Sequence, residues 1–194
     1  APFIAVFLLL SFWKNSTENY YSEIMKNDLT EGRMAFEKQL DIMCAGAFSV
    51  SNDSDLKWVY FLDGLKDGDN NIAALIRCND MLRQTFADSE HYQNYSVIMK
   101  NELIFRKSGM VVGDKFFYDN YCTYQNTDFE TWRKQSFESN TWQLFPLEEI
   151  DTGERTFQAM TFSYPVRNYI QQEPEANAVV QFLLSKENLE QMFG

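Results

Sequence analysis

The sequence predicts an α+β fold in which a long N-terminal helix packs on a five-stranded antiparallel sheet. Apolar residues recur every three or four positions as far as about residue 90, which is the period of an amphipathic helix. Near residue 92 the period changes to two, as expected for strands. Turn residues then separate the strand segments in hairpin order, with helical segments between the second and the third. With 194 residues, of which 45% are hydrophobic, the chain can form one folded domain with an appended helix.

The first half of the chain contains three helical segments. In residues 16–50 the apolar positions step by three or four, which predicts a long helix. Gly32 weakens this helix by about 1 kcal/mol relative to alanine, but it allows another element to approach closely. The polar run 52–55 ends the helix and caps a short one at 55–63, and Asn70 caps a third.

The second half contains the strand segments. Five segments show the strand pattern between turns, and they are residues 95–99, 103–107, 142–147, 156–164 and 178–184. We expect a loop at 108–113 and either a short helix or irregular structure at 114–123. Thr127, followed three residues later by Glu130, forms a capping box that starts another helix. Ser185 caps a final helix.

The N-terminus is unusually apolar. Residues 2–13 carry no charge before Lys14, and as a helix they span about 18 Å, against about 30 Å for the hydrocarbon core of a bilayer. One interpretation is a buried N-terminal strand or helix. The other is the outer part of a transmembrane helix, for which Trp13 and Lys14 form an interfacial anchor.

Charge and motifs exclude several classes of function. The net charge of −11, without any basic run, predicts that this chain binds no nucleic acid. The three cysteines form no CxxC pair, which indicates neither a disulfide framework nor a zinc site. The single histidine, His91, has no nucleophile beside it in the sequence, and no P-loop, GxGxxG, HExxH or nucleophile elbow is present. We therefore expect no catalytic activity, no metal and no cofactor.

Aromatic residues are dense between positions 116 and 142 and suggest where a ligand binds. Small-molecule pockets are mostly apolar and aromatic with a few polar groups. The alternative is that these rings form the helical layer that covers the sheet, since aromatic residues dominate cores as well as sites. If there is a ligand, we expect it between the sheet and this segment, with six candidate contacts: Tyr118, Tyr121, Trp132, Trp142, Tyr164 and Arg167. The rings offer faces and polar edges, and Arg167 can pair with an anion in a bidentate way.

The order of these elements resembles a PAS-like Cache sensor module. The resemblance is to the membrane-distal module of the double Cache regions in membrane-bound AraC-type transcription regulators and related sensor kinases of Gram-positive bacteria. It covers nearly the whole chain and lies in order and spacing. The segments that carry it are residues 1–13, Phe36, Leu40 and Asp41, 95–107, 129–132, Trp142, and 178–193.

The resemblance implies a domain organisation and a function. Residues 1–13 would be the outer part of a transmembrane helix, 14–90 a stalk helix with two further helices, and 91–194 the Cache module with its C-terminal helix. The implied function is extracytoplasmic sensing of a small molecule or peptide at the cell membrane, by an AraC-type regulator. The alternatives are the sensor domain of a two-component histidine kinase, or a surface solute-binding or scaffold protein without a signalling role. The implied partners are the ligand, the membrane and a second copy through the stalk helix.

One departure limits what the resemblance implies about the ligand. Amino-acid-sensing double Cache domains carry a Tyr, then an Arg, then a Trp-Tyr pair, and later an Asp. Here Arg133 follows Trp132, and there is no Trp-Tyr pair. Amino-acid recognition is therefore not inferred, and a sugar, an organic acid, a peptide or no small ligand all stay open.

Overall fold

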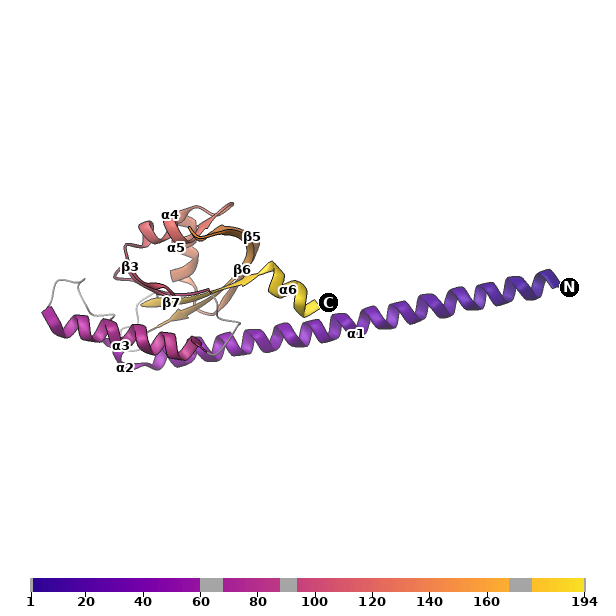
Figure 1. Cartoon of the computed structure of the whole chain (residues 1–194), viewed down its shortest axis with the longest axis horizontal. Helices are drawn as coiled ribbons and strands as arrows, with labels where there is room; N and C mark the ends of the chain where they lie inside the picture. The colour runs from indigo at the N-terminus through magenta and orange to yellow at the C-terminus, as the bar shows by residue number, and fades with distance from the viewer. Residues whose placement is uncertain (1, 60–67, 88–93, 168–175, 194) are drawn as a thin grey trace.

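The computed structural model describes residues 2–59, 68–87, 94–167 and 176–193. Helix α1, Pro2–Asn52, contains 51 residues, and its N-terminal part extends far beyond the rest of the chain (Figure 1). At 1.5 Å per residue it is about 76 Å long. The predicted helix at 16–50 is thus confirmed, and the apolar segment 2–13 continues it. Within the described residues, no helix has both the length and the apolarity that a bilayer crossing requires.

Two shorter helices follow α1. Helix α2, Ser54–Val59, is capped by Asp53, whose Oδ1 accepts a hydrogen bond of 2.9 Å from the Leu56 N–H. The remainder of the helix predicted at 55–63 lies outside the described residues. Helix α3, Gly68–Ala87, begins two residues before Asn70, so that the predicted cap is wrong and Asn70 lies inside the helix.

The strands form one antiparallel sheet in the order β3-β2-β1-β7-β6-β5-β4. The seven strands found in the described residues are β1 Tyr95–Met99, β2 Leu103–Arg106, β3 Gly109–Val112, β4 Thr123–Tyr124, β5 Gln143–Asp151, β6 Thr156–Val166 and β7 Ala178–Ser185. The five predicted strands are present, but the prediction of a five-stranded sheet and of a loop at 108–113 was wrong. Strand β3 occupies that loop and pairs along its whole length with β2, and β4 adds two residues beside β5. Strand β4 is too short for a period of two to be visible in the sequence, and β3 begins with a glycine, which disfavours strands.

The sheet lies between two helical layers. On one face, Val97, Val180 and Phe182 share a core with apolar residues of α1, α2 and α3. On the other face, Ile98 and Val179 share a core with α4, Asp114–Tyr121, and α5, Phe129–Glu138. Because neighbouring residues on a strand point to opposite faces, a strand covered on both sides is buried at every position, as all five residues of the central strand β1 are, whereas most of β5 is half-buried or exposed.

The predicted capping box of α5 is replaced by a different cap. Asp128 is the N-cap, and its side chain accepts a 2.8 Å hydrogen bond from the Thr131 N–H. The hydroxyl of Thr127 instead donates to Glu148 on β5 at 3.0 Å. The helix was therefore predicted correctly from an N-cap that is one residue too early.

The last helix, α6 at Lys186–Phe193, returns to α1. The predicted cap is confirmed, because the Asn188 N–H donates to the hydroxyl of Ser185 at 3.2 Å. The rings of Phe36 and Phe193 lie 6.4 Å apart between centroids. At Gly32 a Cβ atom would lie 2.3 Å from Phe193 Cδ1 and 2.9 Å from the backbone oxygen of Met192. The expectation that Gly32 permits a close approach is thus confirmed.

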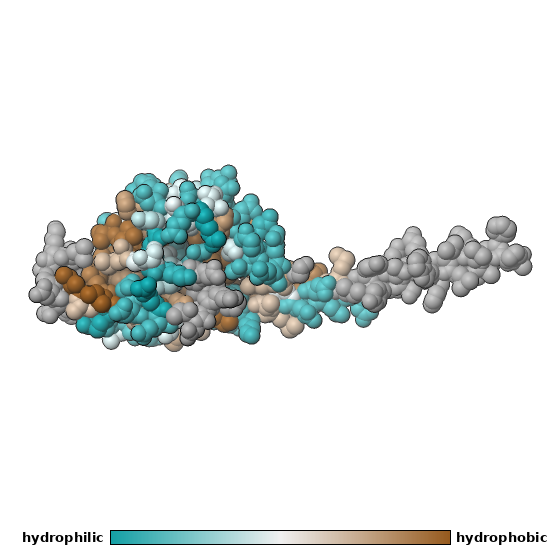
Figure 2. Space-filling view, in the orientation of Figure 1, coloured by the Kyte–Doolittle hydropathy of each residue, from teal (hydrophilic) through white to brown (hydrophobic). Residues whose placement is uncertain are grey.

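Exposed apolar side chains gather at the end of the domain farthest from the N-terminus. Figure 2 shows them as brown areas over the start of α3 and near β3 and α4. The exposed large apolar residues of these three elements are Ile72, Ile76, Met110, Val112 and Phe116, and others lie on α1, on or beside β5, and on α6. The opposite side of the domain, towards β5 and α6, is mainly hydrophilic in the same view.

Candidate ligand-binding site

A cleft of about 490 Å³ opens between the sheet and helix α4. Its floor is formed by β1, β2 and β7, with Ser96, Arg106 and Leu183 among the lining residues. One wall is α4, through Phe117 and Tyr121, and the other is the turn between β5 and β6. Sites for small molecules typically have volumes of about 300–1,000 Å³, so this cleft is large enough for a small organic ligand.

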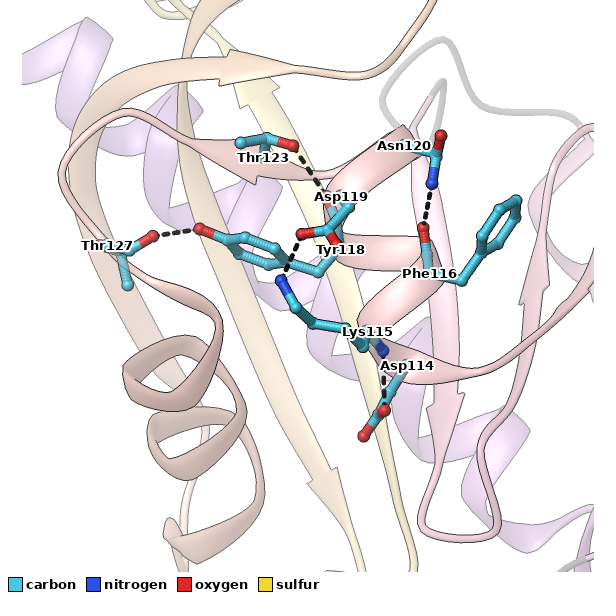
Figure 3. Close-up of polar contacts among 8 residues, drawn as sticks. All are labelled: Asp114, Lys115, Phe116, Tyr118, Asp119, Asn120, Thr123 and Thr127. Atoms are coloured by element: carbon cyan, nitrogen blue, oxygen red, sulfur yellow. Dashed lines mark hydrogen bonds and ion pairs between the residues drawn. The ribbon is translucent and has the colours of Figure 1, made fainter.

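Helix α4 is held firmly against the domain by polar contacts (Figure 3). The hydroxyl of Tyr118 donates a hydrogen bond to the backbone oxygen of Thr127, in the segment before α5. The hydroxyl of Thr123 donates to the backbone oxygen of Tyr118 at 2.8 Å. At the other end of α4, the carboxylate of Asp114 is paired with Arg133 of α5. These contacts fix the wall that carries Tyr121.

The opposite wall depends on a glycine. Gly153 has a φ of +75°, and a Cβ atom there would lie 2.2 Å from the backbone oxygen of Asn120. Only glycine fits both the backbone conformation and this contact. The β5–β6 turn therefore rests on the end of α4, which brings Glu154 and Arg155 to the edge of the cleft.

The cleft is locally positive in a chain of net charge −11. Among the described residues, Arg106, Lys107 and Arg155 line it together with one acidic residue, Glu154. The guanidinium carbon of Arg106 lies 3.9 Å from the ring centroid of Tyr121, which is a close cation–π contact. Its Nη2 donates to Glu154 at 3.5 Å, but the Glu154 side chain is 76% exposed, against 16% for Arg106. The ring therefore holds the guanidinium more firmly than the solvated carboxylate does.

A row of polar residues continues from Arg106 across the floor of the sheet. Directly opposite partners in the ladders give the row Arg106, Ser96, Gln181, Ser163 and Gln143, one residue from each of β2, β1, β7, β6 and β5. Opposite residues in antiparallel strands share a face, so the row faces α4 and α5. Ser96, Gln181 and Ser163 are buried.

Gln181, at the centre of this row, makes only part of the hydrogen bonds that its side chain can form. The Nε2 group of Gln181 donates to the hydroxyl of Ser136 on α5 at 2.9 Å. Its Oε1 atom has no hydrogen-bond donor within the part of the chain that the structure describes. Buried polar atoms normally have a partner, because leaving one unpaired costs about 1–3 kcal/mol. The row therefore retains hydrogen-bonding capacity beneath α5.

Cys122 also lines the cleft, but its chemistry is that of an inert thiol. Burial raises the pKa of this thiol to about 12. At neutral pH the group is protonated, and the thiolate is the reactive form. The arrangement around the cleft is consequently suited to binding through ion pairs, hydrogen bonds and ring contacts.

Three of the predicted site residues lie on the face that carries the cleft. Tyr121 lines the cleft itself. Tyr118 and Trp132 belong to the buried core between the sheet and α5, at 5% and 3% exposure, with ring centroids 5.4 Å apart. Burial raises the pKa of Tyr118. Trp132 also borders a separate cavity of about 130 Å³, which is too small for most organic ligands.

The other three lie elsewhere. Trp142 stacks on Phe162, at 5.7 Å between centroids, and Tyr164 packs on the same core as Phe162, on the face that α1 and α3 cover. Arg167 donates to the backbone oxygen of Ser139, the C-cap of α5, at 2.8 Å. The six residues therefore do not line one cavity, and a ligand contact for any of them stays a prediction.

Sequence reasoning missed the cations of the cleft. Ser96 carried a usable signal, because it is a polar residue between two apolar residues of a strand, and Arg106 carried a weaker one, because it follows three apolar residues but precedes Lys107. Lys107 and Arg155 carried none, because basic residues beside a turn are usually solvated. Only the docking of the β5–β6 turn on α4 brings Arg155 to the same cleft as Arg106.

No protein-family model matches the chain, and no curated protein matches it.

Proposed function

We propose that this chain is the ligand-sensing domain of a membrane-anchored signal-transduction protein. In this proposal it faces the extracytoplasmic side, as the Cache modules of membrane-bound AraC-type transcription regulators do. The observation that carries the proposal is the position of the cleft. A ligand-sized cleft lies on one face of the sheet, and the strand that forms part of its floor leads directly into α6, which packs on the long helix α1.

The order of the strands supports a PAS-like module. Without the short edge strands β3 and β4, the sheet contains β2, β1, β7, β6 and β5. Helices α4 and α5 come between the second and third of these strands in the chain and cover one face. This order of strands and helices supports the proposal of a five-stranded PAS-like module, although the sheet also contains β3 and β4.

A short path connects the cleft to the long helix. Leu183 lines the cleft, β7 ends at Ser185, and α6 begins at the next residue. At the far end of α6, Phe193 lies over Gly32 of α1. A ligand that prefers one packing of β7 and α6 would shift the population of α1 positions, which is the minimum requirement for a sensor.

The experiment is hydrogen exchange with and without ligand. The 194-residue chain would first be screened by thermal shift against sugars, organic acids, amino acids and short peptides. For a compound that binds, a sensor predicts altered exchange in the cleft, in α6 and in the part of α1 beneath α6. A surface solute-binding or scaffold protein predicts changes in the cleft alone. Absence of any binder, or changes confined to the cleft, would contradict the proposed function.

A further inference from the structure

We infer that the cleft selects a small organic anion, and that Arg106 binds its carboxylate. The inference rests on the proposed function, because it names the class of ligand for the same cleft. It depends on Arg106, whose side chain is mostly buried and whose N–H donors are mostly without an acceptor among the described residues. The guanidinium has five N–H donors, and the one acceptor it meets among the described residues is Glu154, at 3.5 Å.

The position of Arg106 suits a carboxylate. Its side chain is 16% exposed, and Tyr121 lies against its guanidinium at 3.9 Å. The planar fork is therefore oriented before any ligand arrives, which reduces the entropy lost on binding. Carboxylates accept two parallel hydrogen bonds from such a fork. Glu154 is a weak competitor, because its side chain is 76% exposed and readily solvated.

The neighbouring groups favour an anion over a neutral ligand. Lys107 and Arg155 also line the cleft, so the described residues around it include three cations and one carboxylate. The hydroxyl of Ser96 belongs to the residue directly opposite Arg106 in the ladder and lies in the floor. The groups around the cleft thus supply both positive charge and a neutral hydrogen-bonding partner for the second oxygen of a carboxylate.

The apolar part of the cleft favours an organic anion over an inorganic one. Phe117, Tyr121 and Leu183 line it beside the cations. A phosphate or sulfate ion would fill only a small part of about 490 Å³ and would leave these side chains in contact with water. A carboxylate that carries a hydrocarbon or aromatic portion covers them.

The test uses matched pairs of charged and neutral compounds. Benzoate and benzamide form one pair, succinate and succinamide the other, and inorganic phosphate and glucose complete the panel. Binding to the 194-residue chain would be measured by isothermal titration calorimetry at low and at high salt. We expect at least one carboxylate to bind, its amide to bind at least about tenfold more weakly, and the carboxylate affinity to fall with added salt.

Substitutions locate the interaction. Arg106→Gln removes the charge and keeps most of the side chain, and it should weaken carboxylate binding roughly 10- to 100-fold. Arg106→Lys keeps the charge but loses the fork, and it should weaken binding less. Lys134→Gln, an exposed cation on α5 outside the cleft, is the matched control and should leave affinity unchanged. If Arg106→Gln fails to fold by circular dichroism, Arg155→Gln at the exposed wall replaces it, with an expected loss of several-fold.

The outcomes separate this inference from the proposed function. If the amides or glucose bind as well as the carboxylates, or if Arg106→Gln behaves as Lys134→Gln does, the anion assignment is overturned while the cleft remains a ligand site. If phosphate competes equally with every carboxylate, the organic character is overturned. If no compound of this panel or of the wider screen binds, both the inference and the proposed function fail.

Discussion

Replacing Gly32 with alanine should release α6 from α1 while leaving the domain folded. The new Cβ atom would lie 2.3 Å from a ring carbon of Phe193 and 2.9 Å from the backbone oxygen of Met192. The ring can rotate away, but the backbone oxygen moves only if α6 moves. Gly32→Ala therefore tests whether this contact is the connection between the C-terminal helix and the long helix.

The free energies involved indicate whether Gly32→Ala detaches α6 or unfolds the whole domain. Phe193 is 43% exposed, so slightly more than half of a Phe side chain is buried, which is worth about 1–2 kcal/mol. No residue of α6 is fully buried. Against this loss, alanine stabilises the interior of α1 by about 1 kcal/mol relative to glycine. The two effects nearly cancel in the free energy of unfolding of the whole domain. Detachment of α6 therefore relieves the clash with the smallest loss of stability.

Hydrogen exchange measured by mass spectrometry provides the assay. We expect faster exchange of the α6 amides in Gly32→Ala, with a melting temperature within a few degrees of the original. Asn27→Ala is the matched control, because Asn27 is exposed on the same helix and the change raises helix propensity there, away from α6. Unchanged protection of α6 in Gly32→Ala, or equal deprotection in Asn27→Ala, would refute the reasoning.

Three further predictions concern the N-terminus, α5 and the cleft. Removal of residues 1–13 should leave a soluble, folded domain if, as the proposed function implies, their apolar character serves a bilayer; an unfolded circular dichroism spectrum would show that they belong to the core. Arg167→Ala should cost about 1–2 kcal/mol in urea denaturation and increase exchange at the end of α5, because the cation no longer binds the Ser139 oxygen at the C-cap; a change in ligand affinity without loss of stability would contradict this. Stability should fall as pH rises from about 9 towards 12, because burial raises the pKa of Cys122 to about 12 and the unfolded thiol ionises first. The Cys122→Ala variant should show a shallower decline over the same range, and an identical slope would contradict the assignment.

The pattern of apolar and turn residues within each segment was sufficient to predict most of the helices and strands. The hairpin of β1 and β2 follows from two short apolar segments separated by turn residues, and α1 follows from a helical period over many turns. Strand β3 was missed because Gly109–Val112 begins with glycine, which disfavours strands, and because its pairing with β2 is not visible in the sequence. The Ser108-Gly109 pair after β2 was a turn signal that pointed to this second hairpin.

The candidate site was harder to predict because a strand residue has two possible faces. Trp142 precedes Gln143, which pairs with Ser163 on the cleft face, so Trp142 points to the opposite side. A shift of one residue exchanges the faces of a strand. In a sheet covered on both sides the apolar pattern does not mark which face is which, since β1 is buried at all five positions.

Most of the helices and strands, their order and the close approach at Gly32 follow from the sequence, because they depend on residue period, caps and a missing side chain; the short strands β3 and β4 do not. Only the tertiary structure decided which helices cover which face and which residues meet in the cleft. Arg106 and Arg155 are 49 positions apart and come together because β7 pairs between β1 and β6 while the Gly153 turn rests on α4. Such contacts depend on strand pairing between distant segments, and no local period encodes that pairing.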